Sequence, residues 1–168
     1  MNIRPETQAD YLAIAQIHKL AFARQEEADL VEKIRNSQYY IPQLTLVAEV
    51  NNFVVAHVMF SYIHLVGKET FQVIGLAPIA VEPDFQNQGI GSALINAGLN
   101  KANVLGETLI IVLGHPQFYS RFGFKPSVDF DIESPFPVPE DAFMVKPLAN
   151  YRSRYKGKVI YPATFQNV

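Results

Sequence analysis

Apolar and polar positions in the first third of the chain repeat at close to helical spacing. Residues 12–21 and 26–35 each place apolar side chains mainly on one face, so both segments are predicted to be amphipathic helices. The threonine and aspartate at residues 7 and 10 resemble a capping box that opens the first helix, after a short strand that ends at residues 3–4. We expect Pro42 to close this helical region.

Three β-forming segments follow, and the short turns between them predict antiparallel pairing. Residues 45–50 and 53–64 are rich in β-branched and aromatic side chains, and Asn51 and Asn52 between them tolerate the left-handed conformations of a tight hairpin turn. Residues 71–81 contain the apolar run IGLAPIAV, which is typical of a buried central strand.

The pattern then changes to one β-α-β unit and a less regular C-terminal part. Residues 90–102 are predicted to be a helix, and the apolar run TLIIVL at residues 108–113 is expected of a strand buried on both faces. Residues 134–139, SPFPVP, form an extended loop in this prediction because alternating prolines forbid a helix or a central strand. Residues 142–145 and 159–161 either add strands to the sheet or cover it.

Composition narrows the class of protein. The 168 residues fit one domain, 18% of them are charged, and no apolar stretch reaches the ~20 residues of a membrane span. The absence of cysteine excludes disulfides and thiolate metal sites, and the N-terminus does not resemble a secretory signal, so we expect a cytoplasmic protein that does not associate with membranes. A net charge of −2 gives no general attraction to nucleic acid, and no nucleic-acid partner is predicted.

The stretch QNQGIGSAL, residues 86–94, stands where the strand at residues 71–81 meets the next helix. Without side chains at Gly89 and Gly91, backbone N–H groups can approach a ligand closely, and the start of a helix attracts anions. A pyrophosphate is therefore the expected ligand. Alternatively, the two glycines only allow a tight turn or close packing. A dinucleotide-binding fingerprint is disfavoured because Leu94 occupies the position of its third small residue, and no Gly-Lys-Ser or Gly-Lys-Thr tripeptide of a Walker loop occurs.

This stretch resembles the pyrophosphate loop of the GNAT superfamily of acyl-CoA-dependent N-acetyltransferases. Gln86, Gly89 and Gly91 fill the family pattern of Gln or Arg, two residues, Gly, one residue, and Gly or Ala. Residues 118–124, FYSRFGF, match the family segment Phe-Tyr-x-x-x-Gly-Phe about thirty residues downstream. The likeness extends over roughly residues 1–126.

The resemblance implies a fold and a cofactor site. The fold would be a single α/β domain over residues 1–168, with a mixed, mostly antiparallel sheet flanked by helices and splayed between its fourth and fifth strands to admit acyl-CoA. Residues 1–126 would form the motif-bearing core, and residues 127–168 a C-terminal extension that covers the acceptor side. Acetyl-CoA would be the acyl donor, without a metal. The backbone groups of the splayed strand would bind the pantetheine arm at Ile79, Ala80 and Val81. The pyrophosphate would lie over the turn formed by Gln86, Asn87, Gln88, Gly89, Ile90, Gly91 and Ser92.

The catalytic residue that the resemblance implies is Tyr119, placed to protonate the departing CoA thiolate or to hydrogen-bond its sulfur. A phenol with a pKa near 10 keeps its proton at neutral pH, which suits this role. In the alternative, Tyr119 packs in a cluster with neighbouring phenylalanines. The sequence departs from the family at Val112, where many members carry an asparagine that contacts CoA. His115, in the segment LGHPQFY of a subgroup with undefined acceptors, either contacts the cofactor or is a solvated side chain.

The implied reaction is direct acetyl transfer to a primary amine of a small molecule or peptide. The amine must first lose a proton, and the sequence offers Glu26, Glu27, Glu82 or a water chain as the base without selecting one. A non-catalytic acyl-CoA-binding module is the alternative function. The sequence leaves open the acceptor, the acyl chain length and the oligomeric state, a homodimer included.

Overall fold

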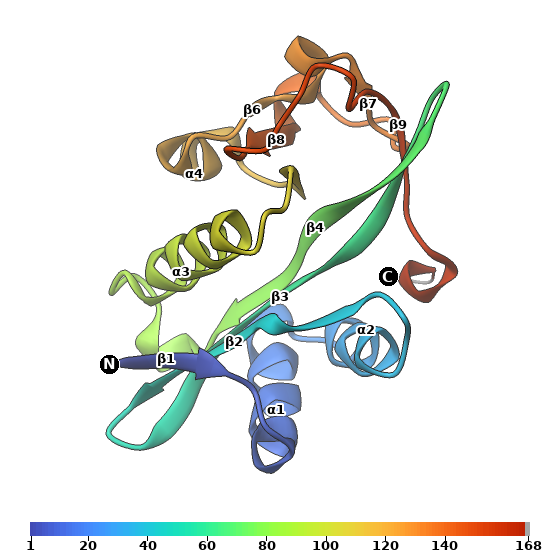
Figure 1. Cartoon of the computed structure of the whole chain (residues 1–168). Helices are drawn as coiled ribbons and strands as arrows, with labels where there is room; N and C mark the ends of the chain where they lie inside the picture. The colour runs from blue at the N-terminus through green and yellow to red at the C-terminus, as the bar shows by residue number, and fades with distance from the viewer. Residues whose placement is uncertain (167–168) are drawn as a thin grey trace. The chain divides into compact units, whose positions relative to one another are not determined.

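The computed structural model describes residues 1–166 and has a mixed α/β fold with a mostly antiparallel sheet and flanking helices, as predicted (Figure 1). The helices are α1 Tyr11–Phe22, α2 Glu26–Arg35, α3 Ile90–Val104 and the short α4 Pro116–Tyr119. The strands are β1 Asn2–Pro5, β2 Tyr40–Val50, β3 Phe53–Val66, β4 Thr70–Val81, β5 Leu109–Leu113, β6 Lys125–Pro126, β7 Ile132–Glu133, β8 Phe143–Pro147 and β9 Gly157–Ile160. Single 3-10 turns connect several of these elements.

The chain divides into two compact units. The first contains residues 1–61, 77–101 and 163–166, and the second contains residues 62–76 and 102–162. Strands β3 and β4 each contribute one part to either unit. In the order of hydrogen-bonded neighbours, the main path of strands is β1-β2-β3-β4-β5-β8-β6.

In the first unit, the two faces of β3 carry different helices. β2 pairs antiparallel with β3, and side chains of a strand alternate between its faces, so His57 and Met59 share one face while Phe60 lies on the other. Met59 packs with α1 and α2 in a buried cluster that includes Ile14 and Ile34. On the opposite face, α3 is so close to Phe60 that a Cβ at Gly98 would lie 2.1 Å from the ring, which explains why this helix has glycine there.

The second unit is built around β5. This strand pairs in parallel with β4, Ile74 with Ile110 and Gly75 with Ile111, and antiparallel with β8 on its other side. All its residues except Leu113 are buried, as its continuous apolar sequence predicts. β4 continues from Leu76 to Val81 beyond its pairing with β5, which is consistent with the predicted splay of these two strands.

Several boundaries differ from the sequence prediction. Pro42 was expected to close the helical region, but it lies inside β2, because the register between β2 and β3 is interrupted between Tyr40 and Thr45 and a residue without an N–H fits such an irregularity. Of the two alternatives for residues 142–145, the structure has the strand: it begins one residue later, as β8, and runs to Pro147. Residues 159–161, for which the same two alternatives were open, overlap with strand β9, which begins earlier, at Gly157. The SPFPVP loop is irregular, as predicted.

No helix within residues 1–166 is long and apolar enough to cross a membrane.

Candidate active site

The turn between β4 and α3 is held in shape by two of its own glutamine side chains. Gln86 donates a hydrogen bond from Nε2 to the carbonyl oxygen of Val81, the last residue of β4, at 3.0 Å. Gln88 donates from Nε2 to the carbonyl oxygen of Asp84 at 3.4 Å. Because these amides bond to backbone of the turn and of the strand before it, they fix the path of the turn.

The structure explains the glycine at one of the two glycine positions of this turn and not at the other. Gly89 has a φ of +83°, a conformation that residues with a Cβ rarely adopt, and Asn87 also has a positive φ, of 63°. Gly91 has no positive φ, and a Cβ built on it would meet only Val81, at an ordinary contact distance of 3.6 Å. The backbone conformation therefore explains Gly89, whereas neither conformation nor packing gives an internal reason for Gly91.

The start of α3 presents N–H groups that the helix itself does not use. Its first helical hydrogen bond runs from the N–H of Ala93 to the oxygen of Gly89, at 3.0 Å. The N–H groups of Ile90 and Gly91 precede this bond and stand at the positive end of the helix dipole. Such an end suits an anion such as a pyrophosphate, and a bare Gly91 leaves space for it.

The end of β4 carries the three residues predicted to bind the pantetheine arm. Ala80 is buried, whereas Ile79 and Val81 on either side are partly exposed. Just beyond them, the N–H of Glu82 donates to the oxygen of Val55 on β3 at 2.8 Å, which ties the end of β4 to its neighbour. These residues and the glycine turn belong to the first unit, so one compact body carries every predicted cofactor-binding residue.

Tyr119 belongs to the second unit, where it ends the short helix α4. Its side chain is buried, and burial raises its pKa to about 12. The ring packs edge-on against Phe118 and Phe124, with ring centroids 5.0 and 5.7 Å apart. Tyr119 therefore does pack in an aromatic cluster, as the alternative interpretation proposed. Its raised pKa means that the phenol is protonated at neutral pH.

Gly114 is the residue of this region that the sequence reasoning missed. A Cβ at this position would lie 2.4 Å from Cε2 of Tyr119, so the ring occupies space that only a glycine leaves open. The N–H of Gly114 donates to the oxygen of Ala142 at 2.9 Å, which fixes the backbone under the ring. A glycine directly after a buried strand, five residues before the tyrosine, is the signal in the sequence.

His115 has a backbone role in placing Tyr119. It precedes α4, and its carbonyl oxygen accepts the N–H groups of Phe118 and Tyr119, each at 3.1 Å. Its own side chain is exposed. The structure thus shows how the segment LGHPQFY positions the tyrosine through its glycine and its backbone.

The candidate bases differ in what surrounds them. The carboxylate of Glu27 is held by Arg24, with Nε 2.8 and 3.1 Å from its two oxygens and Nη2 also in contact. Glu26 lies farther from the same guanidinium, at 3.7 Å. Glu82 lines a mostly apolar cavity of about 480 Å³ together with residues of α1, β2 and β3. The Arg24 guanidinium thus occupies hydrogen-bonding positions of the Glu27 carboxylate that an acceptor amine would need, which weighs against Glu27.

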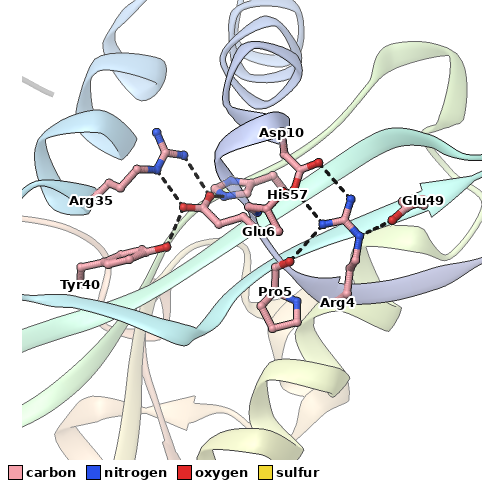
Figure 2. A network of polar contacts seen from close by, with 9 residues as sticks. Arg4, Pro5, Glu6, Asp10, Arg35, Tyr40, Glu49 and His57 are labelled. Atoms are coloured by element: carbon pink, nitrogen blue, oxygen red, sulfur yellow. Dashed lines mark hydrogen bonds and ion pairs between the residues drawn. The ribbon is translucent and has the colours of Figure 1, made fainter.

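A second group of titratable side chains lies buried between β1, α1, α2 and β3 (Figure 2). Glu6 accepts hydrogen bonds from Nε and Nη2 of Arg35 at 2.8 and 2.9 Å, from the hydroxyl of Tyr40 at 2.8 Å and from Nε2 of His57 at 3.0 Å. Burial alone would raise the pKa of Glu6, but these donors lower it to about 2. We call Glu6, Arg35, Tyr40, His57 and His18 the buried cluster.

The ionised Glu6 sets the proton positions in this cluster. Because Glu6 accepts from Nε2 of His57, Nδ1 of a neutral His57 is an acceptor, and it lies 2.9 Å from Nε2 of His18. His18 then donates through Nε2, and its Nδ1 is a buried acceptor without a partner in the described chain. Burial, together with nearby positive charge, lowers the pKa of His18 to about 3, so this imidazole is too weak a base to deprotonate an ammonium group.

Comparison with known proteins finds one matching family model and several similar proteins. The family model described as an acetyltransferase (GNAT) domain matches residues 2–127. The uncharacterized N-acetyltransferase YhbS of Escherichia coli is 34% identical over 151 residues, which cover 89% of each chain. The uncharacterized N-acetyltransferase YjhQ of the same species is 33% identical over 135 residues, 79% of this chain and 75% of YjhQ.

Solved structures show the same similarity. The crystal structure of E. coli YhbS in complex with CoA has a TM-score of 0.90 at 32% identity, covering 99% of this chain and 92% of that one. A GNAT family acetyltransferase from Brucella melitensis in complex with acetyl-CoA has a TM-score of 0.80 at 29% identity, covering 98% of this chain and 97% of that one.

Proposed function

Because this chain belongs to the GNAT family of N-acetyltransferases, we propose that it transfers an acetyl group from acetyl-CoA directly to a primary amine of a small molecule or peptide, with residues 1–168 acting as one acyltransferase domain. Relatives that are similar over nearly their whole length were crystallised with CoA and with acetyl-CoA, which supports acetyl-CoA as the donor. The single observation in this molecule that carries the proposal is Gly91, a bare position at a helix start that the protein's own packing does not require.

Cofactor binding would use backbone rather than side chains. In the proposed complex, the pantetheine arm adds to the exposed backbone of Ile79, Ala80 and Val81 in the manner of an extra strand. The pyrophosphate lies over the turn from Gln86 to Ser92, against the first N–H groups of α3. Mutation of side chains around the turn should therefore affect affinity less than a negative charge added within it.

Acyl transfer then needs three proton and charge events. The neutral amine attacks the thioester carbon, and N–H groups near Ala80 and Val81 stabilise the oxygen of the tetrahedral intermediate as preorganised donors. The carbon–sulfur bond breaks, the carbonyl re-forms, and sulfur leaves with the bonding electrons. The attacking nitrogen gives up its proton to a carboxylate or a water, among which Glu82 is free of the guanidinium that holds Glu27.

The raised pKa of Tyr119 favours one of its two suggested roles. With a pKa of about 12, the phenol is more than 3 pKa units less acidic than a free thiol of pKa ~8.5. Complete proton transfer to the thiolate is therefore uphill, whereas a hydrogen bond from the phenol to the developing negative charge on sulfur stabilises it without that transfer. We accordingly assign Tyr119 the role of hydrogen-bond donor to the leaving sulfur.

The test is calorimetric titration of acetyl-CoA into the wild type and a Gly91→Glu variant. Gly91 is the better site for the added carboxylate, because Gly89 has a positive φ and a side chain there would strain the fold itself. Gln25→Glu is the matched control, since it adds the same charge at the exposed start of α2. We expect binding in the wild type and in Gln25→Glu, and at least ~100-fold weaker binding in Gly91→Glu, from charge repulsion together with lost space.

Either of two results would overturn the proposal. One is the absence of acetyl-CoA binding by the folded wild type, and the other is equal binding by a folded Gly91→Glu variant. Turnover is then measured with a panel of amines by the release of free CoA. Because the chain contains no cysteine, a thiol reagent detects CoA without a signal from the protein.

A further inference from the structure

The helical segment that carries Tyr119 also carries an exposed cation. α4 continues directly into a 3-10 turn, Ser120–Phe122, so residues 116–122 form one helical run in the second unit. Tyr119 is buried, whereas Arg121 is exposed. A residue two positions farther along a helix points about 200° away, so the two side chains leave the run in nearly opposite directions. The run therefore places an aromatic ring inward and a guanidinium group on the surface.

The Arg121 guanidinium group lies against two aromatic rings of the same run. Its Cζ is 4.8 Å from the ring centroid of Phe118 and 5.4 Å from that of Phe122, and its Nε donates to the carbonyl oxygen of Phe118 at 3.3 Å. A guanidinium group restrained in this way loses less freedom when it binds a ligand. Its planar set of donors fits a phosphate group, which it can bind through two parallel hydrogen bonds.

Lys146 brings a second cation to the C-terminal end of this run. It lies on β8, and its Nζ is so near Gly123, the residue after the run, that a Cβ built on this glycine would be 2.5 Å from it. Lys146 is partly buried, and its ammonium group forms no ion pair or hydrogen bond with any of residues 1–166. The helix dipole attracts a cation to this end but uses none of the ammonium hydrogens. Lys146 can therefore donate hydrogen bonds to a ligand.

Positive charge is in excess around the end of this run. β6 pairs with β8, so residues 114–127 and 143–147 belong to neighbouring segments. Among their residues, those that are Lys, Arg, Asp or Glu are Arg121, Lys125 and Lys146, all of them positive, although the whole chain has a net charge of −2. A local excess of one sign of charge attracts ligands of the opposite sign. These two segments are therefore suited to bind an anion.

Acetyl-CoA, the donor in the proposed function, carries two kinds of phosphate. Its pyrophosphate already has partners in the proposed complex, the first N–H groups of α3. Its 3′-phosphate is a monoester, a group whose charge at neutral pH is about −1.5 to −2, so one arginine and one lysine can balance it. We propose that Arg121 and Lys146 bind the 3′-phosphate of CoA. This inference rests on the proposed function and extends it, because it makes the nucleotide end of the cofactor a determinant of binding.

The experiment compares acetyl-CoA with acetyl-dephospho-CoA, which lacks only the 3′-phosphate, by calorimetric titration of the full chain. The wild type should bind acetyl-CoA at least ~10-fold more tightly, and the difference should shrink as salt screens the charges. Arg121→Gln should weaken acetyl-CoA binding about 10-fold, the contribution of a charge-assisted hydrogen bond, and leave the affinity for acetyl-dephospho-CoA within about twofold of wild type. Lys146→Gln should act in the same direction by about two- to fivefold, because lysine acts as a point charge without the fork geometry.

Two further variants separate phosphate binding from other effects. Arg154→Gln is the matched control, because Arg154 is also exposed, belongs to the second unit and lies over two rings, those of Phe71 and Tyr155. It should leave both affinities unchanged. Arg121→Lys keeps the charge without the planar fork, so it should lose less affinity for acetyl-CoA than Arg121→Gln. If Arg121 only held α4 in place, its loss would change the binding of both ligands alike.

Three outcomes would overturn this inference alone and leave the proposed function standing. They are equal affinity of the wild type for the two ligands, an Arg121→Gln variant that binds acetyl-CoA as tightly as Arg154→Gln, and an equal loss for both ligands in Arg121→Gln. A folded wild type that binds neither ligand would overturn the proposed function, and this inference with it.

Discussion

The buried cluster and the glycine turn are two polar regions of the same compact unit, and they satisfy their polar groups in opposite ways. In the buried cluster, one carboxylate receives four hydrogen bonds from protein side chains. In the glycine turn, the first N–H groups of α3 precede any helical partner, and the nearby side-chain amides bond elsewhere in the turn. The first region satisfies its polar groups within the fold, whereas the second has donors at a helix start that precede the first helical bond.

This difference gives a rule for interpreting substitutions in the first unit. A change in the buried cluster should alter the free energy of unfolding and leave the affinity of folded molecules for acetyl-CoA intact. A charge added at Gly91, which has no positive φ, should alter that affinity and leave the free energy of unfolding nearly intact. The predictions below test this separation.

Glu6→Gln should produce the largest loss of stability. It removes the negative charge between Arg35 and His57 while the Arg35 guanidinium remains largely buried, and breaking such a pair costs about 3–5 kcal/mol. Urea denaturation measures the loss. The control is Glu49→Gln, which removes a partly exposed partner of Arg4 and should cost under about 1 kcal/mol. Equal losses in the two variants would show that the buried cluster has no special structural role.

Acid should destabilise the protein through the same cluster. His18 has its pKa lowered to about 3 from an ordinary 6.5, so between these values the unfolded chain binds a proton that the folded chain does not. The stabilisation is complete above pH 6.5 and is lost as the pH falls, by about 1.4 kcal/mol per pH unit, or about 2 kcal/mol at pH 5. Burial also lowers the pKa of His57, which adds to the loss in the same direction.

Below pH 4.5, Glu6 also contributes to the loss of stability. Its pKa is lowered to about 2, so as the pH falls the unfolded chain takes up a proton on Glu6 before the folded chain does. Urea denaturation from pH 7 to pH 4 measures the slope. His18→Gln should reduce it by about one proton, whereas His115→Gln removes an exposed ring and should leave it unchanged. A stability that stays constant from pH 7 to pH 5 would contradict the neutral state assigned to the two histidines.

Much of the fold could be predicted, because a strong hydrophobic period identifies a helix or a strand from its own local sequence. The continuous apolar run of β5 and the paired asparagines of the β2-β3 hairpin are examples, and both asparagines have positive φ as expected. Pro42 was misjudged, because a proline inside a strand is tolerated only where the register is interrupted, and the partner strand decides that. The buried cluster was not foreseen, since Glu6 and His57 are 51 positions apart.

The candidate site could also be predicted only in part from the sequence. Its residue types and spacing indicated the glycine turn and Tyr119, but the sequence presents Gly89, Gly91 and Gly114 as equivalent bare positions. Only the structure separates a glycine needed for its φ, one needed by a neighbouring ring and one that no internal contact requires. Their roles in binding and catalysis remain predictions from geometry and family membership.

Gly114→Ala should have an intermediate effect, on both stability and catalysis. Its methyl group would overlap the Tyr119 ring, and overpacking of this kind costs about 1–3 kcal/mol and displaces the ring. If Tyr119 hydrogen-bonds the leaving sulfur, kcat should fall in Gly114→Ala and in Tyr119→Phe, while the affinity for acetyl-CoA stays within about threefold of wild type.

The double variant Gly114→Ala/Tyr119→Ala provides the control for this prediction. Removing the ring removes the overlap, so the stability loss of the pair should be smaller than the sum of the two single losses. Strict additivity would mean that the ring and the methyl group do not compete for the same space. Unchanged kcat in Tyr119→Phe would remove Tyr119 from the proposed mechanism.

The smallest change in stability should come from Gly91→Ala, which compares two glycines on one helix. A methyl group at Gly91 meets only ordinary contact with Val81, and alanine favours helix over glycine, so the variant should be as stable as wild type or more stable by up to about 1 kcal/mol. Gly98→Ala, seven positions later, places its Cβ 2.1 Å from Phe60 and should be destabilised instead. Acetyl-CoA titration should not follow this ranking: both folded variants should bind within about threefold of wild type, because the family pattern accepts Gly or Ala at the position of Gly91 and Gly98 lies away from the turn. A Gly91→Ala protein that is destabilised as much as Gly98→Ala would contradict the open space seen beside Gly91 and would remove the distinction between the two glycines.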